Sequence, residues 1–166
     1  FGSGFCIFND CAVTARVLLE RNELQSVLVL DLDVHQGDGT AACFADDPRV
    51  VTVSVHAASN FPLRKVASDH DLPLADATGD QEYLAVIGDR LPGLLDEIRP
   101  QLVLYNAGVD AHRDDRLGRL DLSDEGLMQR DRLVLDACLR RRLPVATGIG
   151  GGYDTRQPRG RRHAIV

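Results

Sequence analysis

The 166-residue chain is 44% hydrophobic and 27% charged, which gives it the length and composition of one globular domain with a sizeable core. Its formal net charge of -6 argues against direct binding of nucleic acid, and no apolar run approaches the roughly 20 residues that span a membrane. The four cysteines form no CxxC pair, which favours reduced thiols in a cytoplasmic protein over a disulfide framework or a cysteine metal site.

Helical and strand patterns alternate along the chain. Asn9 and Asp10 precede an amphipathic stretch and supply a helix cap, and the apolar run SVLVLDL that follows is typical of a central parallel strand. Residues 56–78 lack periodicity and are expected to form a long loop, and Pro92 and Gly93 are expected to kink or divide the helix around them. In chain order, the patterns predict a helix at 11–22, a strand at 26–32, a short helix at 40–44, a strand at 49–56, a helix at 79–100, a strand at 101–110, a helix at 123–142 and a strand that runs from 143 into a glycine-rich turn.

Acids and a histidine follow the predicted strands at their carboxyl ends. The alternation predicts an α/β fold with a mainly parallel sheet, and such sheets bind ligands beyond those ends. Asp33 and His35 stand two residues apart, so in an extended backbone their side chains point to one side, and Asp110 ends another strand. Two aspartates and a histidine leave a position open for water, as a catalytic zinc site requires. The alternative is helix caps or ion pairs, but the nearby Asp31 and Asp38 favour a cation, because buried carboxylates need a partner.

The stretch GIGGGYD ends the last predicted strand. It is either a flexible turn or a place where glycines let the backbone approach a ligand and set Tyr153 at the rim of the sheet. A phenol in that position can donate a hydrogen bond to a developing oxyanion. The stretch is not a phosphate-binding loop, because the Lys and the Ser or Thr of that motif are missing.

Five motifs in order, GFCIFND, DLDVHQGDGT, VTVSVH, YNAGVD and GGGY, resemble the histone deacetylase family. The stretch TGDQEYL and the residues after YNAGVD look most like the class IV branch and related bacterial deacylases. The resemblance covers essentially the whole chain. It implies the arginase-deacetylase fold, a three-layer αβα arrangement, and zinc-dependent hydrolysis of the amide of an acylated lysine.

The resemblance also implies roles for single residues. Asp33, His35 and Asp110 match the ligands of one catalytic zinc ion, which lowers the pKa of its bound water. Tyr153 matches the phenol that polarises the acyl carbonyl and stabilises the oxyanion. The remaining matches are with the substrate channel, and they are Gly4, Phe5, Gly151 and Gly152.

Monovalent cations are implied as well. One site, which would hold K⁺ and support the zinc loop, matches Asp31, Asp33, His35 and Ser54. A second such site falls at Phe44 and Val50. The partners implied by the resemblance are an acylated lysine peptide or an acylated small amine.

One departure concerns the general base and acid. The family places two adjacent histidines shortly before GFC, and Asp31 and Asp38 match the acids that orient them. The chain begins at Phe1, so we expect residues 1–166 to be a fragment of a histone deacetylase-like catalytic domain that lacks this pair. On this expectation the chain by itself is catalytically impaired.

Three alternatives remain open. A ureohydrolase of the same fold would use two manganese ions, but position 37 is Gly where that chemistry places an acid, and the third strand ends in one acid, Asp110. A small-amine deacylase, such as one acting on acetylated polyamines, would keep the same zinc ligands. A binding module would recognise acyl-lysine without turnover.

Overall fold

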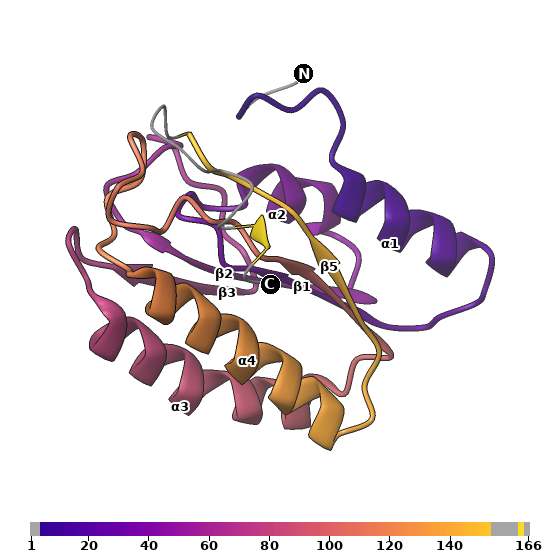
Figure 1. The fold of residues 1–166 in the computed structure, drawn as a ribbon. Helices are drawn as coiled ribbons and strands as arrows, with labels where there is room; N and C mark the ends of the chain where they lie inside the picture. Colours follow the sequence, from indigo (N-terminus) through magenta and orange to yellow (C-terminus); the bar gives the residue numbers. More distant parts are fainter. Residues whose placement is uncertain (1–3, 154–162, 165–166) are drawn as a thin grey trace.

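The computed structural model of the protein describes residues 4–153 and 163–164, in which helices and strands alternate (Figure 1). The Asn9 side chain accepts a hydrogen bond from the Ala12 amide and caps the first helix, as expected, and Ser123 caps a later helix through Gly126. In chain order the elements are α1 (Asp10–Glu20), β1 (Val27–Asp31), α2 (Asp38–Phe44), β2 (Val50–Ala57), β3 (His70–Leu74), α3 (Asp80–Ile98), β4 (Leu102–Asn106), α4 (Asp124–Arg140) and β5 (Val145–Gly148).

The five strands form one parallel sheet in the order β3-β2-β1-β4-β5. Helices α1 and α2 lie on one face of it, and α3 and α4 pack side by side on the other (Figure 1). The predicted three-layer αβα architecture is therefore confirmed. Among the described helices, none combines the length and the apolar character needed to cross a membrane.

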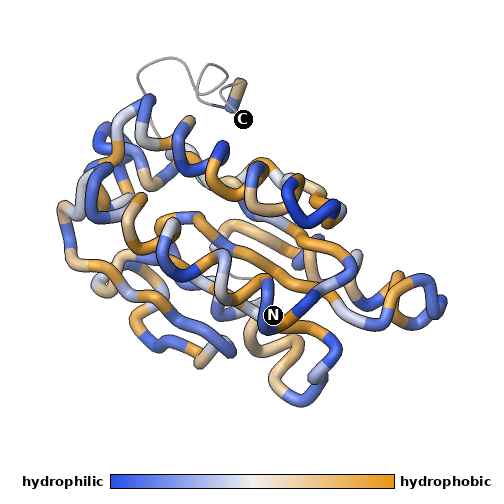
Figure 2. Tube along the Cα trace, turned by 90° about the horizontal axis from the view of Figure 1, so that it is seen from below, coloured by the Kyte–Doolittle hydropathy of each residue, from blue (hydrophilic) through white to orange (hydrophobic). Residues whose placement is uncertain are grey.

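Strand β1 sends alternate side chains into two hydrophobic cores, as the two-residue period of a strand requires. Val27 and Val29 pack with Leu19 of α1, whereas Leu28 and Leu30 belong to the larger core under α3 and α4. Figure 2 shows the hydrophobic colour running through the middle of the molecule and alternating with hydrophilic colour along the helices. A strand covered on both faces needs a continuous apolar run, which is the pattern of SVLVLDL.

The sheet has a switch point between β1 and β4. From β1 the chain moves outward through β2 and β3, and α3 then returns it to β4 on the other side of β1. The two strands pair to their ends, where Asp31 stands opposite Asn106. In open parallel sheets, the crevice at such a switch point is the usual ligand site. The loops that follow β1 and β4 carry the predicted metal ligands.

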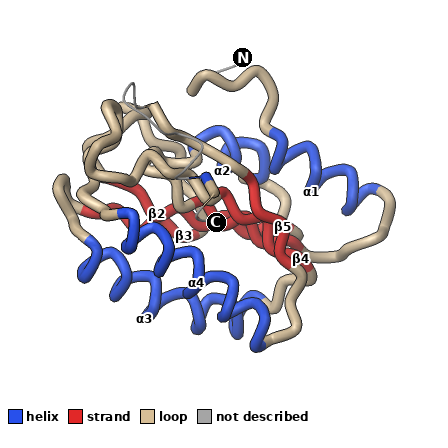
Figure 3. Tube along the Cα trace, viewed as in Figure 1, coloured by secondary structure: helices blue, strands red, loops and turns tan. Residues whose placement is uncertain are grey.

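Residues 56–78 are not the continuous loop that the sequence predicts, because His70–Leu74 form strand β3 (Figure 3). β3 lies at the edge of the sheet and pairs with β2, with Ala57 opposite Leu74. Pro73 interrupts the β pattern locally, and an edge strand tolerates it because only one side needs a hydrogen-bonding partner. Pairing with β2, rather than local propensity, makes this segment a strand.

Helix α3 runs unbroken through Pro92 and Gly93, so the helix is not divided there, and the alternative of a kink stays a prediction. Buried residues lie on both sides of the proline, with Ile87 and Leu91 before it and Leu94 after it. All three belong to one hydrophobic core. Their burial holds both halves of the helix on the sheet and outweighs the roughly 3 kcal/mol that an interior proline costs.

Candidate metal centre

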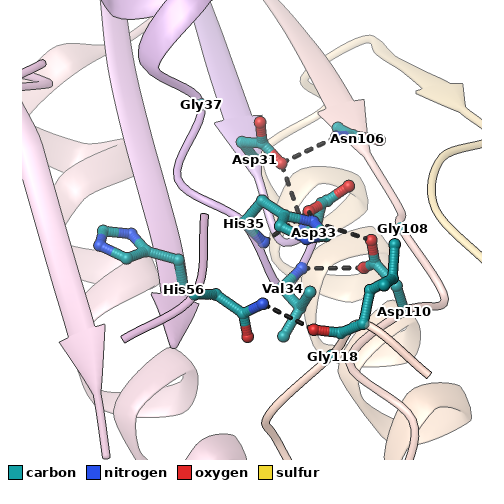
Figure 4. A network of polar contacts seen from close by, with 12 residues as sticks. Asp31, Asp33, Val34, His35, Gly37, His56, Asn106, Gly108, Asp110 and Gly118 are labelled. Atoms are coloured by element: carbon teal, nitrogen blue, oxygen red, sulfur yellow. Dashed lines mark hydrogen bonds and ion pairs between the residues drawn. The ribbon is translucent and has the colours of Figure 1, made fainter. Parts of the chain in front are cut away.

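Two predicted ligands follow the end of β1 (Figure 4). The Asp31 carboxylate accepts a hydrogen bond from the Asp33 amide at 3.1 Å, and the Asp33 carboxylate accepts one from the His35 amide at 2.6 Å. These are successive Asx turns, in which a side chain bonds the backbone two residues ahead. They place His35 Nδ1 2.9 Å from Asp33 Oδ1. The pair therefore converges as predicted, but through turns rather than an extended backbone, because the strand ends at Asp31.

The third predicted ligand reaches the same point from the loop after β4. One oxygen of Asp110, Oδ1, accepts a hydrogen bond from the Val34 amide at 2.9 Å, which ties this loop to the one after β1 (Figure 4). The other, Oδ2, lies 3.2 Å from His35 Nδ1 and is buried without a hydrogen bond from the described residues. The ligand atoms of Asp33, His35 and Asp110 all lie within 4.8 Å of one another.

These three residues fit a divalent metal ion. Their donors are one imidazole nitrogen and carboxylate oxygens, the set that zinc accepts in catalytic sites. A buried carboxylate needs a positive partner, and Asp110 Oδ2 is buried beside the other two ligand atoms, 3.2 Å from His35 Nδ1. A cation between them would complete its coordination and offset the repulsion between the two carboxylates.

The charges of the group shift each other's protonation. Burial, and then the negative charge of Asp110, raise the pKa of Asp33 to about 6. For His35, burial by itself lowers the pKa, but hydrogen bonds and charges from Asp110 and Asp33 outweigh it and raise the pKa to about 10. When no metal is bound, the raised pKa keeps His35 protonated near neutral pH.

Asp31 lies directly behind the metal group. Its carboxylate accepts a hydrogen bond from the Asn106 side chain at 2.8 Å, and Ser54 stands opposite it on β2. Burial and then the charge of Asp33 raise the pKa of Asp31 to about 8. A Cβ on Gly37 would lie only 2.7 Å from the Asp31 carboxylate, so the loop closes tightly over this acid.

Two glycines let the loops approach the ligands closely. Gly151 has φ +62°, and a Cβ there would stand 2.4 Å from the Asp110 carboxyl carbon. A Cβ on Gly108 would stand 2.7 Å from the Asp33 Cβ. The predicted close approach of the GIGGGYD backbone to the site is thus present at Gly151, where both the conformation and the space require glycine.

Tyr153 and Phe5 lie over the metal group. The Tyr153 ring centre is 5.9 Å from that of His35, edge to face, and 5.5 Å from that of Phe5. Phe5 is 85% exposed, and both it and Gly4 adopt positive φ. Burial, and then the charges of Asp110 and Asp33, raise the pKa of Tyr153 to about 12, so its phenol remains protonated near neutral pH.

Other predicted residues lie farther from the ligands or behind them. Asp38 is the first residue of α2, and within the described ranges its carboxylate has no hydrogen bond or ion pair. Gly152 follows Gly151 at φ +89° and faces Val109. Phe44 and Val50 are buried in the core under α1. The roles expected for these residues stay predictions.

Sequence reasoning missed three residues around the site. Asn106 binds Asp31, and Asp115 accepts the Tyr153 amide at 2.7 Å. The third, Arg130, is fully buried on α4. Helical spacing could have revealed its burial, because Arg130 shares the buried face of α4 with Leu127 and Val134.

The chain is similar in sequence to known proteins. The histone deacetylase domain model matches residues 1–165, so the chain belongs to the histone deacetylase family. An uncharacterized protein of Picosynechococcus sp. is 51% identical over 153 residues, covering 92% of this chain and 51% of that protein. Histone deacetylase 2 of Arabidopsis thaliana is 31% identical over 155 residues, covering 92% of this chain and 40% of the relative. The chain thus spans about half the length, or less, of these relatives.

Solved structures agree with this assignment. The HD domain of HDA15 superposes with a TM-score of 0.81 at 24% identity, covering 99% of this chain and 51% of that one. A histone deacetylase homologue complexed with SAHA superposes with a TM-score of 0.78 at 26% identity, covering 92% and 43%. The expected arginase-deacetylase fold is confirmed.

Proposed function

We propose that the full-length protein is a zinc-dependent deacylase, most like class IV of its family, that hydrolyses the amide of an acylated lysine. The observation that carries this proposal is the convergence of Asp33, His35 and Asp110 at the switch point of the sheet, where their ligand atoms lie within 4.8 Å of one another. Family membership supports deacetylase chemistry at this site.

Asp33, His35 and Asp110 would hold the zinc ion. Zinc in such a site supplies Lewis-acid chemistry that polarises a carbonyl and activates water. The Tyr153 phenol donates a hydrogen bond to the oxygen of the acyl carbonyl and stabilises the negative charge that develops there. Its raised pKa, about 12, suits this role because a donor must keep its proton.

Aromatic side chains above the metal group suit an aliphatic substrate. Phe5 lies next to Tyr153, and the Phe61 ring centre lies 6.5 Å from that of His35. These rings would flank the lysine methylenes, with the backbone of Gly4 beside Phe5 and the Gly151–Gly152 turn beneath. The net charge of -6 favours a cationic partner, such as a lysine-rich peptide.

The acids behind the ligands would support the zinc loop. Asp31 and Ser54, with Asp33 and His35, would hold a K⁺ ion, which would also neutralise the buried Asp31 carboxylate. Asp31 and Asp38 would orient the general base and acid of the whole catalytic domain. With four free cysteines, of which Cys138 is buried, we place the protein in the cytoplasm.

A small-amine deacylase is the second candidate, because the same zinc ligands and the same phenol serve both substrates. A two-metal ureohydrolase is less well supported, since in the described ranges only one group of acids and histidine converges at metal-binding distances.

The test is hydrolysis of acetyl-lysine peptides, long-chain acyl-lysine peptides and acetylated polyamines by the zinc-loaded, full-length natural protein. Chelated protein and the Tyr153→Phe variant are run alongside. We expect chelation to abolish turnover and Tyr153→Phe to lower kcat by roughly 100- to 1000-fold. Preference for the polyamine would select the second candidate, and no turnover by metal-bound protein would overturn both.

A further inference from the structure

A buried ionic cluster lies between α4 and the sheet, directly beneath the metal group. Arg130 is completely buried, and its Nε donates to Asp131 Oδ1 at 2.9 Å. The Tyr105 hydroxyl, from β4, donates to the same carboxylate oxygen. Among the described residues, Arg130 Nη2 and Asp131 Oδ2 have no hydrogen-bond partner. The cluster is therefore incompletely satisfied.

Stability alone is a poor reason for such a cluster. Burying two charges costs several kcal/mol each, and well-packed apolar residues in their place are often as stable or more so. The neighbouring buried positions of α4, Leu127 and Val134, are apolar. The informative contacts are thus those that an apolar residue could not make.

Arg130 joins the two loops that carry the metal ligands. Its Nη1 donates to the Leu32 carbonyl at 3.2 Å and to the Gly108 carbonyl at 2.6 Å. Leu32 directly precedes Asp33, and Gly108 stands two residues before Asp110. One guanidinium nitrogen therefore bridges the backbone on both sides of the switch point.

The bridge stands where the hydrogen-bond ladder between β1 and β4 ends. The Leu32 amide donates to the Asn106 carbonyl at 3.1 Å. In a continuing parallel ladder, the Leu32 carbonyl would next accept from the Gly108 amide. Here Arg130 donates to the Leu32 carbonyl and to the Gly108 carbonyl instead. It joins the two chains at the point where they leave the sheet.

Because Gly108 packs closely against Asp33, the Arg130 bridge affects the relative position of the predicted ligands. A Cβ on Gly108 would collide with Asp33, so backbone and ligand are already in contact there (Figure 4). A shift of the Gly108 carbonyl would move Asp110 relative to Asp33. Catalytic sites lose activity when such ligands are displaced by fractions of an ångström.

We propose that Arg130 is a positioning residue for the metal centre, setting the separation of Asp33 and Asp110 through the Leu32 and Gly108 carbonyls. This inference rests on the proposed function, because it concerns the metal that the site would hold. Among the described residues, the hydrogen bonds of Arg130 go to Asp131 and to the Leu32 and Gly108 carbonyls, not to the side chains of the predicted ligands. It acts through the backbone.

The test compares zinc affinity and the Co²⁺ absorption spectrum of four forms of the full-length protein. They are the wild type, Arg130→Lys, the double variant Arg130→Met with Asp131→Asn, and Arg141→Met. The double variant leaves no lone buried charge, so it is more apt to fold than Arg130→Met by itself. Arg141 is the matched control, since at the opposite end of α4 it joins the helix to the Asp96 carboxylate and the Pro92 carbonyl of α3.

We expect the double variant to bind zinc roughly 10- to 100-fold more weakly, the range typical when a supporting partner of a metal site is lost. Its Co²⁺ spectrum should shift, because the ligand separation changes. Arg130→Lys should recover most of the affinity. Arg141→Met should stay within about twofold of the wild type, as distant sites act independently.

Two results would overturn the proposal. One is a double variant with wild-type zinc affinity and spectrum, and the other is an equal loss in Arg141→Met, which would indicate general destabilisation. If the wild type binds zinc but hydrolyses no acylated substrate, the proposed function fails while the ranking of zinc affinities still decides the role of Arg130. A wild type that binds no zinc would overturn both.

Discussion

Aspartates at the two ends of the sheet have opposite shifts in pKa. At the amino ends of the strands, Asp47 pairs with Arg49 at 2.7 Å and with Arg16 at 2.8 Å, and these hydrogen bonds lower its pKa to about 2. At the carboxyl ends, Asp31 and Asp33 lie half-buried beside each other, and their pKa values are raised to about 8 and 6. The acid at the amino ends is paired with arginines, whereas the acids at the carboxyl ends repel each other and would be stabilised by a cation.

This contrast indicates different roles for the two groups of acids. The ion pairs around Asp47 lie at the surface with half-buried partners, and surface ion pairs contribute little to stability and tolerate change. The buried group around Asp33 is destabilising without a partner, which is a condition that folding alone does not favour. The raised pKa values of Asp31 and Asp33 support the proposal of a functional site at the carboxyl ends of the strands.

Removing a predicted metal ligand should have the largest effect on zinc affinity. Asp110→Asn keeps the Val34 hydrogen bond but loses the charge at Oδ2, so we expect zinc affinity to fall by more than the roughly 100-fold typical of supporting residues. Chelator competition measures this. Asp121→Asn, at an exposed acid paired with Arg113, is the matched control and should bind zinc normally. Equal affinity of both variants would remove Asp110 from the ligand set.

Filling the space beside the predicted ligands should have the next largest effect, on both stability and zinc binding. Gly151→Ala places a methyl group 2.4 Å from the Asp110 carboxyl carbon at φ +62°, and strain of this kind costs about 1–3 kcal/mol. We expect lower stability in urea unfolding and weaker zinc binding together. Stability lost with zinc affinity intact would mean that the Gly151 turn moves without displacing Asp110.

The pH dependence of stability should reverse sign between the two ends. In metal-free, K⁺-free protein, Asp31 has a folded pKa of about 8, above the unfolded value of 3.8, so its contribution is fully present below 3.8 and is lost as the pH rises through 8. Asp47, with a folded pKa of about 2, contributes above 3.8 and loses this contribution as the pH falls through 2.

Urea unfolding across this range tests the reversal. Asp31→Asn should flatten the loss of stability between pH 4 and 8, since the uncharged amide needs no cation. Asp47→Asn should lower stability by a similar amount across pH 4 to 8, so that the slope there is unchanged, and it should remove part of the loss of stability below pH 4. Parallel pH profiles for the wild type and Asp31→Asn would contradict the raised pKa.

The smallest expected effect lies far from both groups. A Cβ on Gly93, inside α3, would meet no atom within 4 Å. Gly93→Ala should therefore stabilise the protein by about 0.5–1 kcal/mol, the helical preference of alanine over glycine. Thermal unfolding measures this. Destabilisation would show that the helix needs flexibility beside Pro92.

Residues of the predicted site differ in how easily the sequence alone predicts their position. Asp33 and His35 are close in sequence, and their spacing of two was enough to predict a pair. Asp110 was predicted from its place after another strand, because parallel strands bring their carboxyl ends to one edge. Arg130 was missed because a charged residue in a helix usually faces solvent, and only the neighbours at helical spacing reveal its burial.

The sequence by itself determined the alternation of helices and strands apart from β3, the parallel sheet and the residue types of the predicted metal site, because these depend on local hydrophobic period and on residue chemistry. Tertiary structure decided what depends on distant neighbours. It made His70–Leu74 a strand by pairing it with β2, kept α3 whole across Pro92 by burying both halves, and brought Asp110 to a loop 76 residues away. Such outcomes follow from packing and hydrogen bonds between segments, whose energies no local pattern contains.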